Sequence, residues 1–321
     1  MSCVKNGILA VGIAIFCSLS CAAGERTIDT AITTAITQAA SPNELNREVQ
    51  LPDGRHIAIK CFGSGSPMVI LEAGFDWGGS WSWLSVLPGV GRFTRVCAYD
   101  RAGSGFSEPG PMPRDAKHIV SDLHALLRAA GEKPPYILVG HSLGGVLVRL
   151  YRIRYPSEVE GMVLVDPSQP GPNEWRKPWI PKLHRCLKLA EQGAITADTK
   201  DCMPPNMNSP PSVVVAVAQR PDTWRSQISE LEHVDAYFSE LRIAERPPIV
   251  TPLIVLTASE QTGLDAKALA NWIAGHKSIA ALSSRGKQRL IPGSSHNVPV
   301  DRPEVVVQAV EDMIRGAGSP P

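Results

Sequence analysis

A serine in the stretch Gly140–Gly145, which reads GHSLGG, most constrains what this chain of 321 residues can fold into. The stretch matches G-x-S-x-G, follows the apolar run 135–139 and precedes the helix-like segment 146–155. A strand that turns sharply into a helix needs small residues two positions either side of the serine. Such a turn exposes the serine hydroxyl away from the backbone and places the N-terminus of the helix behind the serine. G-x-S-x-G is short and also occurs by chance in loops, but its context favours a nucleophile at Ser142.

Apolar runs that look like strands alternate with helical segments along most of the chain. The predicted strands are 47–51, 56–61, 68–71, 95–99, 136–139, 162–165, 252–256 and 288–291. The predicted helices are 77–87, 115–130, 146–155, 266–274 and 303–314. The first two strands flank Asp53-Gly54 and are typical of a hairpin. Alternating strands and helices predict an α/β fold with a mostly parallel sheet and helices on both faces.

Between Pro167 and about Pro248 the alternation is lost and prolines become dense. Weak helical patterns remain at 183–190 and 223–242. We interpret this block as an insertion at one connection of the sheet, placed to form a lid over whatever the serine attacks.

The N-terminus has the pattern of a signal peptide. Lys5 precedes an apolar run at 7–19, and small residues then allow cleavage after Ala23. The run is short for a membrane span of ~20 residues. One alternative is a lipoprotein acylated on Cys21, although Ser18 stands where leucine is usual; another is an uncleaved anchor. We expect export to a bacterial periplasm or medium, with no membrane span after processing.

The composition excludes some classes of partner. The chain is 43% hydrophobic and 20% charged, which suits a globular core, and its net charge is +1. Nucleic acid is therefore not an expected partner. Neither H-x-x-x-H nor C-x-x-C spacing occurs, so we expect no metal and no cofactor.

A serine hydroxyl needs a base within hydrogen-bond reach and an acid that orients the base; in this type of fold they follow in the order Ser, Asp/Glu, His. His296 lies in the loop 293–297, after the last strand, at the carboxyl edge of the sheet beside the serine. Its alternative role is a capping or surface histidine. The other histidines are less suitably placed: His56, His118 and His124 on earlier elements, His141 on the elbow but pointing elsewhere, His184 and His233 in the insertion, and His276 at a helix end.

The acid has two main candidates. Asp166 ends the strand 162–165, and Glu260 follows the next strand along the same edge; Asp265 is a more distant third. Asp166 could instead be a turn residue before Pro167, and Glu260 could be a solvated loop charge. The residues alone leave this choice open.

An oxyanion hole needs two preorganised N–H donors. Leu143, directly after the serine, supplies one. The loop after the strand 68–71 supplies the other: Gly74 lets the backbone approach closely, so the N–H of Phe75 is the candidate.

Four of the seven cysteines lie outside the leader, and an exported chain permits disulfides. Four cysteines allow three pairings. Cys186 and Cys202 share the insertion, while Cys61 and Cys97 each fall on a predicted strand, so we favour these two pairs. The alternative is that some are small buried hydrophobic residues.

Together these motifs resemble the α/β-hydrolase superfamily over residues 47–314. The matching stretches are LEAGF at 71–75, YDRAGSGFS at 99–107, GHSLGG at 140–145, VLVD at 163–166 and SH at 295–296. The second resembles a D-R-x-G-x-G-x-S stretch that braces the site without reacting. The resemblance implies a mostly parallel eight-stranded sheet flanked by helices, with a cap insertion after the sixth strand. The implied organisation is a signal peptide at 1–23, a flexible lead-in at 24–44, a hydrolase domain at 45–315 with its cap at 168–247, and a tail at 316–321.

The chain departs from the family pattern twice. Ala73-Gly74 replaces the usual His-Gly of the oxyanion loop, a change that backbone donors survive. The usual Asp after the seventh strand is missing, but some relatives, such as many haloalkane dehalogenases, place the acid one strand earlier. Asp166 matches that position, so it ranks before Glu260. The family's strand order also sets the strands of Cys61 and Cys97 side by side.

The resemblance implies a serine hydrolase that cleaves a small-molecule ester, or less often an amide, through an acyl-enzyme on Ser142, His296 and Asp166. Dehalogenases and epoxide hydrolases of the superfamily use an aspartate nucleophile, which Ser142 argues against. The alternatives are an acyltransferase or perhydrolase-like (haloperoxidase-like) enzyme on the same residues, and a non-catalytic binding protein. Tryptophans of the insertion suggest an apolar pocket, or simply pack the lid: Trp175, Trp179 and Trp224.

Overall fold

The computed structural model describes residues 45–170, 176–203, 211–261 and 264–317. The predicted signal peptide, the lead-in and Trp175 lie outside these residues. Within them, no helix is both long enough and apolar enough to cross a membrane.

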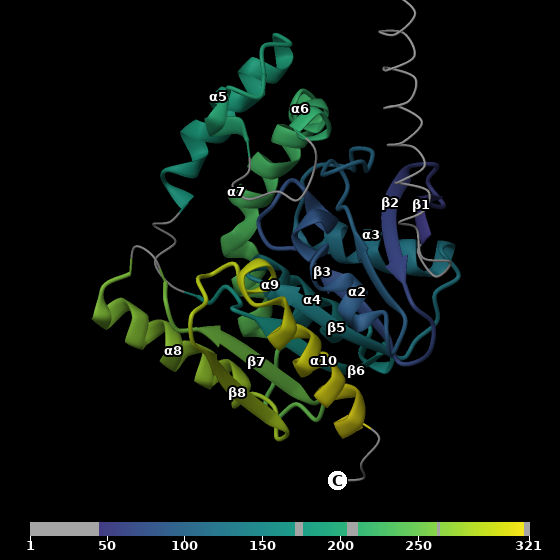
Figure 1. Ribbon diagram of the computed structural model, residues 1–321, viewed down its shortest axis with the longest axis vertical. Coiled ribbons are helices and arrows are strands. Elements are labelled where there is room, and N and C mark those ends of the chain that lie inside the picture. The colour runs from purple at the N-terminus through teal and green to yellow at the C-terminus, as the bar shows by residue number, and fades with distance from the viewer. Residues whose placement is uncertain (1–44, 171–175, 204–210, 262–263, 318–321) are drawn as a thin grey trace, which may run out of the picture. The chain divides into compact units, whose positions relative to one another are not determined.

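An eight-stranded, mostly parallel sheet forms the centre of the described chain, as predicted (Figure 1). Its strands are β1 Leu45–Gln50, β2 His56–Phe62, β3 Met68–Glu72, β4 Val96–Tyr99, β5 Tyr136–His141, β6 Val159–Val165, β7 Leu253–Ala258 and β8 Gly286–Ile291. Their order is β1-β2-β4-β3-β5-β6-β7-β8. The β1–β2 hairpin and the β2–β4 pair are antiparallel, and every other pair is parallel. The carboxyl ends of β5, β6 and β8 therefore meet at one edge.

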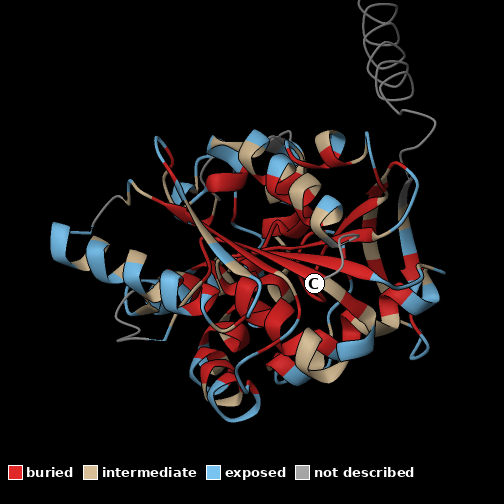
Figure 2. Ribbon diagram, turned by 90° about the horizontal axis from the view of Figure 1, so that it is seen from below, coloured by how far each residue is buried: buried red, intermediate tan, exposed pale blue. Residues whose placement is uncertain are grey.

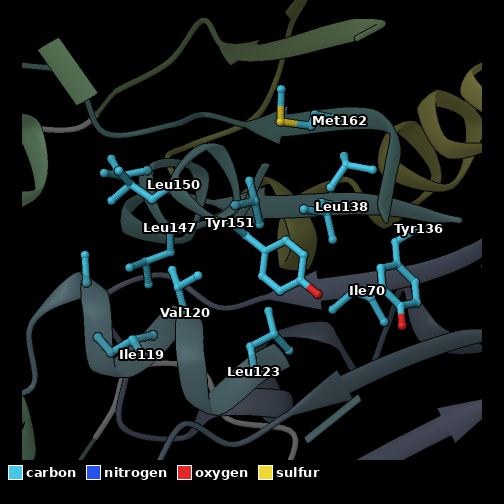
Figure 3. Packing of buried hydrophobic residues seen from close by; sticks show 14 of the residues in the cluster. Ile70, Ile119, Val120, Leu123, Tyr136, Leu138, Leu147, Leu150, Tyr151 and Met162 are labelled. Atoms are coloured by element: carbon cyan, nitrogen blue, oxygen red, sulfur yellow. The ribbon is translucent and has the colours of Figure 1, made fainter. Parts of the chain in front are cut away.

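Helices cover both faces of the sheet, because alternate residues of the central strands point to opposite sides. The helical elements around the sheet are η1 Gly79–Trp83, α2 Leu87–Val90, α3 Ala116–Ala129, α4 Leu143–Arg154, η2 Pro156–Glu158, α8 Ala266–Ala280, α9 Val298–Asp301 and α10 Pro303–Ala317. On one face α3 and α4 pack their apolar side chains against strand residues such as Ile70 and Leu138 (Figure 3). On the other face α2 and α10 pack against the intervening residues, such as Val69 and Val139. The central strands β3 to β7 are accordingly almost fully buried, whereas the edge strand β8 is only partly buried and the outer faces of the helices are largely exposed (Figure 2).

The chain between β6 and β7 builds a third apolar cluster. Its helices are α5 Trp179–Glu191, η4 Lys200–Cys202, α6 Pro211–Ala218 and α7 Pro221–Ala244. Buried side chains of these helices pack on two tryptophans that follow β3, Trp77 and Trp81. We call α5, η4, α6 and α7 the cap helices (Figure 1).

Both favoured disulfides are present. Cys61 and Cys97 face each other in the antiparallel register of β2 and β4. Cys186 of α5 is joined to Cys202 of η4, so the second bridge lies within the cap helices.

The helix predicted at 77–87 is wrong. The structure has a short 3-10 helix, η1, and then the separate single turn α2. Gly79 interrupts the segment because its φ is +58°, and a Cβ there would lie 2.7 Å from Asp100 Oδ1. Four short helical elements, η2, η4, α6 and α9, were not predicted. The last helix, α10, runs to Ala317 and so includes the first residues of the predicted tail.

Candidate active site

The turn between β5 and α4 holds Ser142 at φ 51° and ψ −119°. A non-glycine residue seldom adopts a positive φ, and such strain is typical of functional sites. The neighbouring glycines make the turn possible by close approach: a Cβ on Gly140 would collide with Gly144 O, and a Cβ on Gly144 would collide with Ala73 O. These contacts explain why small residues stand two positions either side of Ser142.

The structure brings Ser142, His296 and Asp166 together from the ends of β5, β8 and β6. The Ser142 Oγ lies 2.8 Å from His296 Nε2, and His296 Nδ1 lies 2.6 Å from Asp166 Oδ2. The imidazole side chain is 37% exposed, whereas the carboxylate side chain is fully buried. Because a carboxylate only accepts hydrogen bonds, Nδ1 carries a proton and Nε2 is left to accept one from the serine.

Four groups donate hydrogen bonds to the buried carboxylate of Asp166. Oδ1 accepts from Ala258 N at 2.9 Å and from Trp272 Nε1 at 3.0 Å. Oδ2 accepts from His296 Nδ1 and from Gln261 Nε2. Burial alone raises the pKa of a carboxyl, but the hydrogen bond from His296, the positive charge of that ring when it is protonated, and the hydrogen bond from Trp272 together outweigh burial and lower the pKa of Asp166. The group is therefore an anion at neutral pH.

The other acid candidates lie apart from His296. Glu260 accepts a hydrogen bond from Gly293 N at 3.0 Å. Asp265 caps the N-terminus of α8, where its side chain accepts a hydrogen bond from Ala268 N at 2.7 Å. Neither makes a hydrogen bond with the imidazole among the contacts of the described residues.

His141 does not point away from the site, contrary to the prediction. Its ring lies 4.9 Å from the ring of His296, and its Nε2 lies 2.8 Å from the carbonyl oxygen of His296. Burial, with the neighbouring His296, lowers the pKa of His141 to about 4, so its ring is neutral and Nε2 donates to that carbonyl. His141 thus supports the backbone of the His296 loop.

His276 lies within α8 and not at its end, which corrects the prediction for this residue. Its Nε2 lies 2.8 Å from Pro167 O and its Nδ1 lies 3.0 Å from Thr257 Oγ1. Nδ1 is also 3.7 Å from Asp166 Oδ1. Burial lowers the pKa of His276, which keeps the ring neutral beside the carboxylate.

Sequence reasoning missed the two side-chain donors to Asp166, Trp272 and Gln261. They come from α8 and from the loop that follows β7. No local motif marks them, because their role depends on which side of α8 and of the loop faces β6.

The two expected oxyanion donors lie on either side of the serine. Leu143 is the first residue of α4, where an N–H has no carbonyl four residues earlier within the helix. Phe75 follows Gly74, which is packed on the elbow: a Cβ on Gly74 would be 3.1 Å from Ser142 Cβ. Gly74, Phe75 and Ser142 line the same cavity.

A cavity of about 330 Å³ opens beside Ser142 and His296. Most of its wall is apolar and aromatic, and the cap helices contribute part of it. Its large apolar side chains are Phe75, Trp77, Trp81, Trp179, Leu183, Met203, Trp224 and Val300. Trp224 contacts Trp77 at a centroid separation of 5.6 Å, and Trp179 contacts Phe75 at 6.2 Å. Trp175, also expected here, lies outside the described residues.

Among the residues that the structure describes, one group has a spacing that could suit a metal ion: the Sγ atoms of Cys61 and Cys97 and a carboxylate oxygen of Glu132 lie within 4.8 Å of one another. The two cysteines are joined in a disulfide, so they offer no thiolate to a metal.

A parallel sheet carrying a serine elbow, with an acid and a histidine from later strands, defines an α/β-type hydrolase. The chain belongs to the alpha/beta hydrolase family, whose model matches residues 69–309. It is 27% identical over 251 residues to the uncharacterized protein YqjL of Bacillus subtilis, covering 78% of this chain and 85% of that protein.

Solved structures show the same fold at low sequence identity. An esterase of Thermogutta terrifontis matches with a TM-score of 0.64 and 18% identity, over 86% of this chain and 100% of that one. An epoxide hydrolase from an endophytic Streptomyces matches with a TM-score of 0.63 and 19% identity, over 86% of this chain and 96% of that one.

Proposed function

We propose that this protein is a serine hydrolase that cleaves carboxylic esters through an acyl-enzyme. The observation that carries the proposal is the continuous hydrogen-bond chain from Ser142 Oγ to His296, 2.8 Å, and from His296 to the buried Asp166, 2.6 Å. Both distances lie within the reach that proton transfer and base orientation require.

The chemistry follows from these positions. Ser142 Oγ adds to the ester carbonyl carbon while its proton moves to His296 Nε2, and Asp166 stabilises the imidazolium. The N–H groups of Phe75 and Leu143 hold the oxyanion. Collapse of the tetrahedral adduct breaks the bond to the alcohol, which leaves with the proton of His296. His296 then takes a proton from water, whose oxygen attacks the acyl carbon. When the bond from the acyl carbon to Ser142 Oγ breaks, His296 gives that proton to Oγ, and the acid leaves the free serine behind.

The nucleophile separates this proposal from the chemistry of other members of the fold. Epoxide hydrolases and dehalogenases of this superfamily attack with an aspartate, and position 142 holds a serine. An acyltransferase or a perhydrolase-like enzyme would use the same three residues with another acceptor in place of water. A non-catalytic binding protein would have no need of the aligned Ser142 and His296.

The cavity favours esters with a bulky apolar or aromatic group over acetate esters. Its wall joins Trp77 of the loop after β3 and Trp81 of η1 to Trp179 and Trp224 of the cap helices. Aromatic side chains supply large apolar contact areas with preferred edge-to-face geometry. We further propose that the enzyme acts outside the cytoplasm, because its two disulfides suit an oxidising compartment.

Labelling of the serine tests the proposal. A fluorophosphonate probe should form a bond from phosphorus to Ser142 Oγ with loss of fluoride, and mass spectrometry should find the adduct on that residue. Ser142→Ala should lose the label and nearly all hydrolysis of p-nitrophenyl esters. Ser278→Ala, an exposed serine of α8, should behave like the wild type and serves as the control.

Labelling or full turnover that persists in Ser142→Ala would overturn the proposal. A panel of p-nitrophenyl acetate, butyrate, octanoate and benzoate would test the preference for bulky acyl groups. Methanol and hydrogen peroxide added as competing acceptors would show whether water is the true acceptor, because an acyltransferase or perhydrolase would divert most of the acyl group to them.

A further inference from the structure

Arg101 lies beneath the loop that follows β3 and is almost fully buried, at 1% exposure. Its guanidinium has five N–H groups, and each of them has an acceptor. The acceptors are Glu72 Oε1 at 2.8 Å, Ala73 O at 2.9 Å, Gly74 O at 2.6 Å, and Glu230 Oε1 and Oε2 at 3.0 Å each. Three of the five contacts are thus to residues 72–74 and two are to the cap helix α7.

The contact to Gly74 O determines where the next N–H points. The peptide between Gly74 and Phe75 is trans, so its C=O and N–H lie in one plane and point in opposite directions. The carbonyl points inward to the buried guanidinium. The N–H of Phe75 must therefore point outward, toward the cavity that Gly74, Phe75 and Ser142 line together.

We propose that Arg101 is a positioning residue that aims the Phe75 N–H at the oxyanion, and that Glu230 holds Arg101 in place from the cap. This inference rests on the proposed serine hydrolase function. Different structural features then orient the two N–H donors of the oxyanion hole. The start of α4 orients the Leu143 N–H, and a buried ion pair between the sheet and the cap helices orients the Phe75 N–H.

The charge of Arg101 also strengthens the donor. A cation that binds a carbonyl oxygen polarises the whole peptide group, so the N–H of the same peptide becomes a better donor, as in other hydrogen-bond chains of low dielectric. Glu72 and Glu230 flank the guanidinium at 2.8 Å and 3.0 Å, and no charge of Arg101 is left unpaired within the cluster. The cation therefore acts on the loop through its contacts and does not attract anionic ligands from solvent.

The test compares Arg101→Lys with the wild type in hydrolysis and in binding of an arylboronic acid. Ser142 Oγ adds to the boron, and the tetrahedral boronate carries a negative oxygen where the oxyanion would lie. Lysine keeps the charge but not the fork that reaches both carbonyls. We expect kcat to fall roughly 100-fold, as for other oxyanion donors, with KM within about threefold of the wild type and the boronate affinity reduced in proportion to kcat.

Arg149→Lys is the matched control. Arg149 forms another buried, two-point ion pair with Glu245, and neither residue lines the cavity. Any general loss from disturbing a buried arginine should appear in both variants, whereas the parallel fall in kcat and boronate affinity should appear only in Arg101→Lys.

A double variant, Arg101→Met with Glu230→Met, serves as the test if the Arg101→Lys protein does not fold. Replacing a buried ion pair by apolar residues of similar volume is often neutral for stability, and it leaves Glu72, whose pKa burial already raises, with the Tyr99 hydroxyl at 2.5 Å. The double variant should show the same loss of kcat and boronate affinity.

Folded variants that keep kcat and boronate affinity within about threefold of the wild type would overturn the inference, as would a rise in KM with kcat unchanged. The failure of the proposed function would look different: ester hydrolysis would then persist in Ser142→Ala, and the wild type would not bind the boronate at all.

Discussion

Replacing Asp166 by asparagine should abolish most of the activity with little change to the fold. The carboxylate accepts four hydrogen bonds, two on each oxygen. In Asp166→Asn the amide oxygen can still accept from Ala258 N and Trp272 Nε1. The NH₂ group then stands where Oδ2 was, facing the donors of His296 and Gln261.

That donor-to-donor contact dictates the tautomer of the histidine. His296 Nδ1 can approach the amide NH₂ at its present 2.6 Å only as an acceptor, so the proton moves to Nε2. Nε2 then faces Ser142 Oγ with a proton and cannot take another. A wrong tautomer in a geometrically intact triad costs roughly 10⁴-fold in kcat, which is about 5.5 kcal/mol of activation free energy.

The assay is kcat for p-nitrophenyl butyrate, with circular dichroism melting as the check on folding. Glu260→Gln is the control, because a glutamine oxygen can still accept from Gly293 N; its kcat should stay within about twofold of the wild type. An Asp166→Asn enzyme that keeps a tenth or more of the wild-type kcat would refute the reasoning. A large loss of kcat in Glu260→Gln would indicate that Glu260 is the acid that orients His296.

Three further predictions follow from the surroundings of the site. Trp272→Phe removes one of the donors to Asp166, which makes the carboxylate a stronger partner for the imidazolium. The acid limb of the profile of kcat/KM against pH should therefore move to higher pH, and a movement to lower pH would contradict this reasoning. The pKa of His141 is about 4 in the folded state, against 6.5 for a free side chain. Between pH 6.5 and pH 4 only the unfolded chain takes up this proton, so the free energy of unfolding should fall by about 3 kcal/mol as the pH falls through this range. Urea unfolding of His141→Gln should show a shallower fall of this free energy with pH, and the same pH dependence as the wild type would contradict the prediction. Replacing the Cys186–Cys202 disulfide by serines should lower the Tm and raise KM, because Asp201 and Met203 beside the disulfide line the cavity. The same change at Cys61–Cys97 should lower the Tm alone. Equal KM values in the two variants would argue against a role of η4 in substrate binding.

The positions of the strands along the chain and the placement of the elbow could be predicted because both depend on local patterns. Apolar alternation marks strands, and the glycines around Ser142 mark a turn into which a Cβ would not fit. The structure places His296 beside that serine because parallel strands bring their carboxyl ends to one edge, which follows from topology without any knowledge of side-chain contacts.

The choice between Asp166 and Glu260 could not be made from the residues alone. Both follow neighbouring strands of the same edge, and only the direction of each side chain separates them. The φ of 44° at Asp166 turns its carboxylate under the imidazole, where Trp272 reaches it from 106 positions away along the chain. Helical periodicity predicts α8 but not which of its residues faces another element.

The ion pair between Arg101 and Glu230 limits how freely the cap helices could be exchanged between this protein and its relatives. Ser142, Asp166 and His296 all lie outside the chain that forms the cap helices, so a chimera that exchanges those helices would keep these three side chains. It would also remove the carboxylate that accepts two of the five hydrogen bonds of a buried guanidinium. A graft that lacks an acid at position 230 would leave two N–H groups of that buried guanidinium without an acceptor, although Glu72 would still balance its charge. A transplanted cap therefore needs a carboxylate of its own at this point if its substrate preference is to be compared with that of the parent.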